Sequence, residues 1–525
     1  MNGSSGSAGT LLARAGKFSS ATLISRVLGY LRDASVAYFF GGSGVTDVFY
    51  TAFRASNLFR RLLGEGALAS AFVPVFSRVL KDESRPEVQR FLSALTASLC
   101  AVLAAVTLGG MVFAPQITRL IAPGFSADPE KFALTVKLTR WIFPFFFFIS
   151  LAALLSGVLN SLKRFFLPAV SPAMLSVAEI GYLFIFMRHY PPDAQIVGLA
   201  VAVVAGGALH FLVQVPALFK EGFSLKLLWE WRHPRSVEVG RLMIPAVIGL
   251  SVDQVNAFVD TICATFLAEG SVTALYNSNR LMQLPLALFG IAVATASLPT
   301  LSEHSAEKDR GVFGRTLGDS LSMVLFSVTP AAVGLLVLGR PIVKLLFEHG
   351  RFTSFATDLT TRALWGYALG LVAYSAVKVL ANAFYAIREP GVPVRAAAFC
   401  MTVNVALNLV LMGPFGVGGL ALATAVSSWL NAAILFRFLA RRLGKGAFDF
   451  SRVAETGAKS AASALAMAAV VWGLTRWAGG LGTLGAVALG IGAGVPAYLA
   501  CARLLNVREL KTALSMFGPG GNIDD

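Results

Sequence analysis

Charged residues are scarce in this sequence, and their scarcity excludes an ordinary soluble fold. Only 14% of the 525 residues are Asp, Glu, Lys or Arg, while 56% are hydrophobic. A soluble protein of this size cannot hide so much apolar surface from water. Apolar blocks of about 20 residues, roughly one bilayer crossing each, recur from near residue 18 to near residue 504. The sequence therefore predicts an all-α membrane protein that crosses the bilayer many times.

The residue patterns that build metal, disulfide or nucleotide sites are also missing. The four cysteines are scattered through apolar blocks, as small buried hydrophobic residues would be. The five histidines lack the spacing of metal ligands. Gly457-Ala-Lys-Ser460 lacks the glycine that a phosphate-binding loop places directly before its lysine. Because no nucleophile stands beside a base either, we expect no cofactor and a transporter rather than an enzyme.

Acidic residues are outnumbered by basic ones, 28 to 44, so that the formal net charge is +16. In a soluble protein this excess would suggest a nucleic-acid partner, which we do not expect here because the excess lies largely in short loops. With a cytoplasmic N-terminus, the basic loops near 78–90, 220–235 and 437–445 share one side, whereas the loops near 41–46 and 414–416 have no Lys or Arg. The positive-inside rule therefore predicts a cytoplasmic N-terminus and an even number of crossings. Two of the opposite loops do carry basic residues.

About 14 crossings of roughly 20 residues each are predicted. Their expected spans are 18–40, 46–66, 89–113, 136–160, 166–188, 195–217, 239–267, 272–298, 313–338, 357–386, 393–413, 416–438, 456–476 and 482–504. Residues 1–17 and 506–525 are expected to be terminal tails, the first of them cytoplasmic. Phe145–Phe148 is expected to face lipid beside a kink at Pro144.

The sequence repeats itself after about 220–227 residues. For example, Phe72-Val-Pro-Val-Phe-Ser77 resembles Ser297-Leu-Pro-Thr-Leu-Ser302. A six-helix unit used twice in the same orientation is predicted, with an N-lobe at 18–220 and a C-lobe at 238–442. The last two helices, at 456–505, lie outside the repeat. Parallel repeats of this kind are typical of secondary transporters whose substrate site lies between the halves.

Ionisable side chains within the first two crossings are costly in a bilayer and indicate function. They are Arg26, Arg32, Asp33, Asp47, Arg54, Arg60, Arg61 and Glu65. Arg280 of the eighth crossing stands at the position of the repeat that is equivalent to Arg54. Positions 47, 54, 61 and 65 are spaced so that a regular helix would align them in a stripe about 27 Å long.

Two interpretations of these charges stay open. Arg60 and Arg61 would snorkel from a helix end, and the three acids would neutralise arginines in structural pairs. Alternatively, the excess of arginine lines a hydrated cationic cavity, where planar guanidinium groups suit phosphate oxygens. We favour the cavity, with Asp33, Asp47 and Glu65 as gating partners in pairs such as Arg26–Asp33 and Arg54–Asp47.

A second polar group lies in the later helices. Its members carry oxygen ligands and are Asp253, Asp260, Asn404, Asn408 and Thr424. Such residues would hold Na⁺ or carry a proton. The alternative is hydrogen bonding between membrane helices, which is common.

Several motifs resemble one bacterial family. Ser25-Arg-Val-Leu-Gly-Tyr-Leu-Arg-Asp33, Asn57-Leu-Phe-Arg-Arg61 and Asn279-Arg-Leu-Met282 are similar to the MurJ (MviN) lipid II flippases of the multidrug/oligosaccharidyl-lipid/polysaccharide exporter superfamily. The resemblance covers about residues 18 to 505. It implies 14 helices in two lobes, a groove for the lipid tail on the last two, and a cationic cavity for the pyrophosphate and headgroup. The essential residues of the family match Arg26, Arg32, Asp33, Asp47, Arg60, Arg61, Glu65 and Arg280.

The resemblance implies a substrate, partners and a location. They are lipid II (an undecaprenyl-pyrophosphate-linked disaccharide-peptide), membrane lipids, other cell-wall synthesis proteins, and the bacterial inner membrane. The sequence departs from many relatives at Asn279, where they have Asp. The second polar group resembles a cation site of some relatives, so coupling to Na⁺, H⁺ or the membrane potential stays open. Alternatives are a flippase for another polyprenyl-pyrophosphate glycan, and a drug or cation antiporter, which would favour an acidic cavity.

Overall fold

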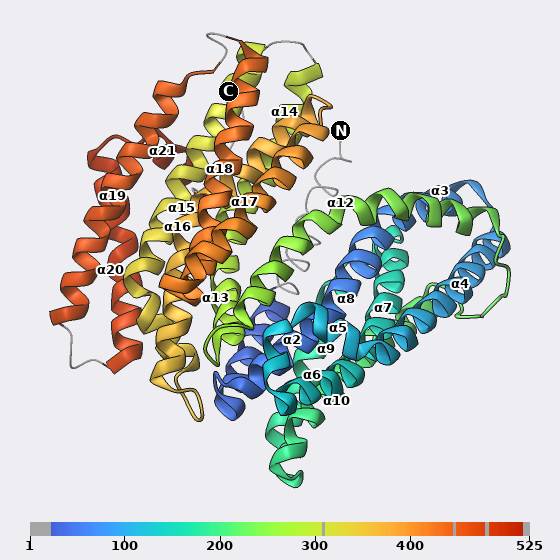
Figure 1. Cartoon of the computed structure of the whole chain (residues 1–525). Helices are drawn as coiled ribbons and strands as arrows, with labels where there is room; N and C mark the ends of the chain where they lie inside the picture. The colour runs from blue at the N-terminus through green and yellow to red at the C-terminus, as the bar shows by residue number, and fades with distance from the viewer. Residues whose placement is uncertain (1–22, 307–309, 445–447, 478–481, 518–525) are drawn as a thin grey trace. The chain divides into compact units, whose positions relative to one another are not determined.

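The computed structural model describes residues 23–306, 310–444, 448–477 and 482–517, and within them every regular element is a helix (Figure 1). In this described part, ten helical spans are long and apolar enough to cross a membrane. The four other expected crossings, at 18–40, 46–66, 166–188 and 239–267, also fall on helical segments where they are described. Residues 18–22 of the first, and the tail expected at 1–17, lie outside the described residues. The prediction of an all-α, multi-pass membrane protein is therefore confirmed.

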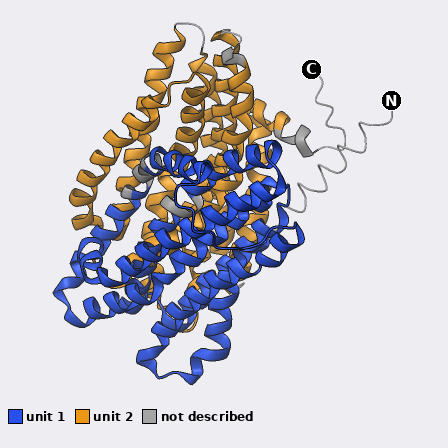
Figure 2. Ribbon diagram, turned by 90° about the vertical axis from the view of Figure 1, so that its right-hand side faces the viewer, with its two compact units in different colours: residues 1–266 blue, residues 267–525 orange. Residues whose placement is uncertain are grey.

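The chain divides into two compact units, Met1–Phe266 and Leu267–Asp525, which Figure 2 colours separately. The first contains a helix at 23–40, then α2 (Gly44–Phe59), η1 (Arg60–Leu68), α3 (Ala69–Asp82), α4 (Arg85–Val112), α5 (Ala114–Ile121), η2 (Pro123–Ala127), α6 (Pro129–Ile142), α7 (Pro144–Ser161), α8 (Phe166–Val170), α9 (Ala173–Gly181), η3 (Tyr182–Phe186), η4 (Met187–His189), α10 (Pro192–Leu212), α11 (Val215–Lys220) and α12 (Pro234–Ala264). The second contains α13 (Ser271–Pro285), η5 (Leu286–Ile291), α14 (Ala292–Ala306), α15 (Arg310–Phe347), α16 (Ser354–Ala386), α17 (Gly391–Phe415), α18 (Val417–Leu443), α19 (Phe450–Trp477), α20 (Gly482–Leu504) and α21 (Arg508–Phe517).

The boundary between the units differs from the one expected between the lobes. The sequence repeat places α12 in the C-lobe, but α12 packs against η1 and α3 and belongs to the first unit. Val239 of α12 is fully buried in the apolar core of that unit. Arg235 at the start of α12 also forms an ion pair with Glu83, which follows α3, at 2.9 Å. These contacts depend on how the helices pack, and a repeat in the sequence does not show which helices pack together.

Aromatic side chains form much of the core of the first unit. Phe72 and Phe76 of α3 stack at 5.0 Å between ring centroids, and Phe91 of α4 packs against both. Phe145 and Phe146 are also buried, so the expectation that they face lipid was wrong. They follow Pro144, which begins α7. Phe143 between α6 and α7 has helical backbone angles, and the two helices together form one span, Pro129–Ser161. Phe145 packs against Phe53 of α2, and Phe146 packs in a cluster with Leu103 of α4.

The second and eighth crossings have the same three-part construction, which supports the repeat. Each begins as an α-helix, passes through a π-helical segment and returns to an α-helix that contains a proline. The π segments begin at Arg60 and Leu286, 226 positions apart, and the prolines are Pro74 and Pro299, 225 positions apart. Two widely separated segments thus share an uncommon backbone feature at the spacing of the sequence repeat.

The C-terminal tail expected at 506–525 contains a helix instead. Val507 and Leu510 are buried in a cluster with Met467 and Tyr498 of the last two long helices. The side chain of Glu509 accepts a hydrogen bond from Thr456 at 3.1 Å. Helix α21 has ten residues, too few for a crossing, which is why a search for apolar spans did not predict it.

Candidate functional site

Three buried charged side chains meet in the first unit. Arg32 donates from Nε and Nη2 to one carboxylate oxygen of Asp33, at 2.9 and 2.6 Å, and from Nη1 to Glu179 at 3.5 Å. The exposed fractions are 6% for Arg32, 1% for Asp33 and 2% for Glu179. Removing charges from water is expensive unless they are paired, so these contacts explain how the helix at 23–40 and α9 carry such residues. They also fix the direction of the guanidinium plane.

Glu179 is the member of this group that the sequence analysis missed. It is an isolated acid in the largely apolar stretch that forms α9 and η3. The rule that drew attention to the charges of the first two crossings, that an ionisable residue inside an apolar span indicates function, applies equally to Glu179. The pair that the sequence favoured for Asp33 was with Arg26, but Asp33 contacts Arg32, and Arg26 is exposed.

Arg54 connects α2 to α12. It is half-buried and donates from Nη1 to the backbone carbonyl of Ala257 at 3.0 Å and to the hydroxyl of Thr261. Both acceptors are uncharged, so the positive charge of Arg54 is oriented by these contacts without being neutralised by them. Asp47, the partner that the sequence favoured for Arg54, lies seven residues earlier on α2 and is 2% exposed. The contacts described for Arg54 are with Ala257 and Thr261 instead of Asp47.

The π-helical segment changes the direction of the charges that follow Arg54. Arg60 is half-buried and donates from Nε to Asn57 at 2.5 Å, whereas Arg61 is exposed. The predicted stripe assumed 100° per residue throughout, but η1 begins at Arg60, and its wider turn breaks that periodicity. The stripe therefore does not continue regularly beyond α2. The backbone of Glu65 lies in η1, and its side chain lies outside the described residues.

Arg280 lies in the second unit, on α13, and is half-buried. Its neighbour Asn279 accepts a hydrogen bond from Gln283 of the same helix at 2.6 Å. Asn279 stands where many members of the resembled family have Asp, and here its side-chain oxygen is bonded along the helix.

Three members of the second polar group, Asn404, Asn408 and Thr424, are joined by hydrogen bonds. Asn408 donates to Asn404 at 3.1 Å, and Asn404 donates to Thr424 at 3.3 Å and to Ser427 at 3.5 Å, so these bonds join α17 to α18. Both asparagines are fully buried. Asp260 is buried in α12 of the first unit, and the side chain of Asp253 lies outside the described residues. The bonds are those that interhelical hydrogen bonding requires, so a cation site here stays a prediction.

Comparison with known proteins decides the family. A family model described as lipid II flippase MurJ matches residues 36–488. The chain belongs to this family. A probable lipid II flippase MurJ of Vibrio cholerae is 36% identical over 514 residues, which cover 94% of this chain and 96% of the relative. A lipid II flippase MurJ of Burkholderia cenocepacia is 36% identical over 425 residues, covering 80% of this chain and 82% of the relative.

Solved structures agree with the family. A lipid II flippase MurJ in an inward closed conformation matches with a TM-score of 0.77 and 28% identity, covering 94% of this chain and 99% of that one. An inward-facing multidrug transporter of the MATE family matches with a TM-score of 0.67 and 12% identity, covering 82% and 98%. At that identity the second likeness shows a common fold alone.

The family model covers some of the candidate residues and not others. Arg54, Arg60, Arg61 and Arg280 lie within the matched residues, whereas the helix that carries Arg32 begins before residue 36. A functional role for Arg32 therefore stays a prediction, and its burial and its two carboxylate partners are the observations that support it.

Proposed function

We propose that this chain moves lipid II from the cytoplasmic to the outer leaflet of the bacterial inner membrane by alternating access of its two halves. Membership of the lipid II flippase MurJ family carries this proposal, since the match spans most of the chain. The transported lipid leaves chemically unchanged, and the N-terminus is cytoplasmic. The basic loops on that side support this orientation.

Arginine side chains are the proposed contacts for the pyrophosphate. Arg32 and Arg54 are held by their neighbours in the first unit, so less conformational freedom is lost when an anion binds than with free side chains. A guanidinium group donates two parallel hydrogen bonds to phosphate oxygens, which a lysine cannot do. Arg26, Arg60, Arg61 and Arg280 are proposed to complete the site. Asp33, Asp47 and Glu65 are proposed to exchange partners with the arginines as access alternates.

The membrane potential is the proposed driving force. Moving one negative charge outward across a membrane that is negative inside releases about 2.3 kcal/mol per 100 mV. A pyrophosphate headgroup therefore gains several kcal/mol unless positive protein charge moves with it. Coupling to Na⁺ or H⁺ through Asp260 and the Asn404–Thr424 group is a second proposal, favoured by the burial of these residues.

Purified protein in vesicles with fluorescent lipid II tests the function. We expect the outer-leaflet fraction, measured by an impermeant quencher, to rise only in vesicles that contain the protein, with the lipid unaltered by mass spectrometry. Arg54→Ala should slow transport at least tenfold, because a lost charge-assisted hydrogen bond is worth about 1.5–3 kcal/mol. Arg188→Ala, at an exposed arginine of η4, is the matched control.

Two outcomes would overturn the proposal. If lipid II stays in its original leaflet while another polyprenyl-pyrophosphate glycan moves, the substrate class is wrong. If the lipid headgroup is chemically altered, the chain is an enzyme.

A further inference from the structure

The segment between α11 and α12 has no regular secondary structure and lies along α4, and we call residues 223–233 the strap. Gln89 of α4 exchanges two hydrogen bonds with the backbone of Ser224, at 2.7 and 2.9 Å. The backbone N–H of Leu228 donates to the backbone carbonyl of Ser93 at 3.4 Å, and the side chain of Glu230 accepts from Arg90 at 2.9 Å. The strap is thus attached to the same helix at successive points along its length, so its side chains have defined directions.

The strap presents large apolar side chains away from the protein. Leu227, Trp229 and Trp231 are 64%, 63% and 51% exposed. The two indole rings pack edge to face at 5.0 Å between centroids. Exposed basic residues, Lys226 and Arg232, lie beside them. Tryptophan with neighbouring basic residues is the composition of segments at the boundary between hydrocarbon and headgroups.

The length of α4 places the strap at this boundary. Its 28 residues span about 42 Å, roughly 12 Å more than the hydrocarbon core of a bilayer. The polar residues of α4 are concentrated in the segment from Arg85 to Arg90, and a long apolar run follows. The excess length therefore lies at that end, and the hydrocarbon begins close to Phe91. Arg90 and Ser93, which hold Glu230 and Leu228, are at this level.

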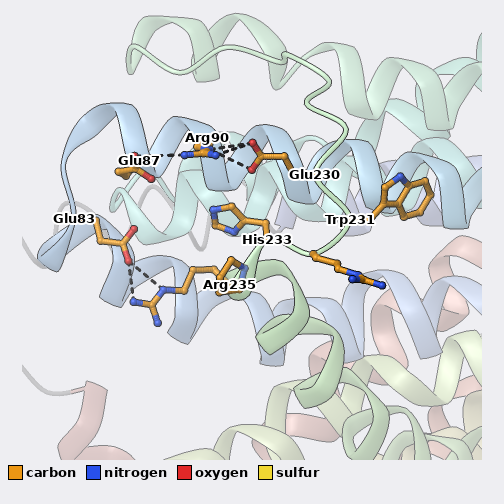
Figure 3. A pocket seen from close by; sticks show the side chains of 9 residues that line it. Glu83, Glu87, Arg90, Glu230, Trp231, His233 and Arg235 are labelled. Carbon is orange, nitrogen blue, oxygen red and sulfur yellow. Dashed lines mark hydrogen bonds and ion pairs between the residues drawn. The ribbon is translucent and has the colours of Figure 1, made fainter.

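A cavity of about 990 Å³ opens beside the strap (Figure 3). Two of the arginines that line it are bound to acids, Arg90 to Glu230 and Arg235 to Glu83, both at 2.9 Å. Among the contacts described for this part of the chain, Arg232 has no carboxylate partner. Its exposed guanidinium leaves one positive charge at the cavity for an anion.

We propose that the strap anchors the first unit in the headgroup layer of one leaflet, where Trp229 and Trp231 enter the boundary and Arg232 binds the phosphate of an anionic phospholipid. This role is independent of lipid II transport, because it concerns the bulk lipid of the leaflet and none of the proposed pyrophosphate contacts. The hydrogen bond from Arg90 lowers the pKa of Glu230 below its usual value, so the ion pair that attaches the strap to α4 is lost only in acid.

The depth of the strap is measured by tryptophan fluorescence. Phe replaces Trp141, Trp365, Trp429, Trp472 and Trp477 so that emission comes from Trp229 and Trp231 alone. In vesicles, lipids brominated near the headgroup end of the acyl chain should quench this emission more strongly than lipids brominated near its terminus. Aqueous iodide should quench it weakly. If iodide quenches strongly and neither brominated lipid does, the strap lies in water and suits a soluble protein partner, and the proposal is wrong.

A second variant provides a test that does not depend on whether the chain with five replaced tryptophans folds. In the otherwise unaltered chain, Trp229→Phe with Trp231→Phe should remove the component that shallow bromine quenches. Equal quenching before and after these two changes would contradict the proposed depth.

The preference for an anionic headgroup is measured with phosphatidylglycerol and phosphatidylcholine. The protein in mixed micelles should retain phosphatidylglycerol preferentially in native mass spectrometry. Arg232→Gln should reduce this preference roughly fivefold, the factor expected for one basic side chain near an anionic surface. Arg188→Gln should not change it. An unchanged preference in Arg232→Gln would refute the phosphate contact even if the depth measurement succeeds.

Discussion

At the scale of single residues, orientation distinguishes the candidate site from a set of arginines in apolar sequence. Arg32 has acids on two sides, from its own helix and from α9. Arg54 is bonded to uncharged groups of α12. A guanidinium held by carboxylates is directed but largely neutralised, whereas one held by a carbonyl and a hydroxyl keeps its charge for an anion. We therefore expect Arg54 to attract the pyrophosphate by its charge, and Arg32 to orient the pyrophosphate by hydrogen bonds in a fixed direction.

Glu179 should position Arg32 without contacting the substrate. Glu179→Ala removes one partner of a buried charge, a change that typically costs about 3–5 kcal/mol of stability. We expect Glu179→Ala to lower the thermal midpoint and transport together. Glu179→Gln keeps a hydrogen-bond acceptor and should recover most of the stability. The two measurements are thermal unfolding in detergent and transport as a function of lipid II concentration.

A surface pair provides the control for Glu179. Asp358 pairs with Arg340 at 3.0 Å, but both side chains are well exposed, so Asp358→Ala should change stability by less than about 1 kcal/mol. If Glu179→Ala is as mild as Asp358→Ala in both measurements, Glu179 does not hold Arg32 in place.

The sequence was sufficient to name Arg32, Asp33 and Arg54 but not their partners. An ionisable residue in an apolar span stands out by composition alone. The identity of its partner depends on which helices pack together, and Arg32–Glu179 joins positions 147 residues apart. The same reason explains why Thr261 was not predicted as an acceptor for Arg54.

At the scale of helices, the apolar spans were predicted well because hydrophobicity is a local property of the sequence. The π segments were not, because the shift to hydrogen bonds over five residues has no compositional signature. This shift is the reason that the predicted stripe fails after Arg60. Since η1 and η5 begin at equivalent positions of the two repeats, we expect both to be places where a crossing changes direction during alternating access.

Close packing at η5 makes this expectation testable. A Cβ atom added at Gly290 would lie 2.2 Å from Oγ and 2.7 Å from Cβ of Ser375 on α16. Gly290→Ala must therefore displace η5 from α16, at a cost of about 1–3 kcal/mol. We expect a lower thermal midpoint and slower transport. Ser375→Gly in the same chain removes both clashing atoms and should restore much of each.

The control for η5 is a glycine with free space around it. Gly334 of α15 has no atom within 4 Å of an added Cβ, and Gly334→Ala should be neutral or stabilise by up to about 1 kcal/mol. If the Gly290→Ala and Ser375→Gly effects simply add, packing between η5 and α16 is not what the first change disturbs.

At the scale of the whole molecule, the sequence predicted two related halves and an all-α membrane fold, and the family match agrees. It did not predict that α12 packs within the first unit, because the repeat records common ancestry of segments rather than their present contacts. Every proposal about transport direction also depends on which ends of the helices face the cytoplasm. Basic loops predict this orientation, with two exceptions among the opposite loops.

Two exposed serines test the orientation. Ser84 lies between α3 and α4 on the side expected to be cytoplasmic, and Ser126 lies in η2 on the opposite side. In a chain whose four cysteines are replaced by alanine, Ser126→Cys should react with an impermeant maleimide in spheroplasts. Ser84→Cys should react only after the membrane is permeabilised. Because the strap binds α4 close to Ser84, this pattern would also assign Trp229 and Trp231 to the inner leaflet, from which a flippase collects its lipid. The reverse pattern would invert the membrane orientation and, with it, the direction in which the potential drives an anionic headgroup through the protein.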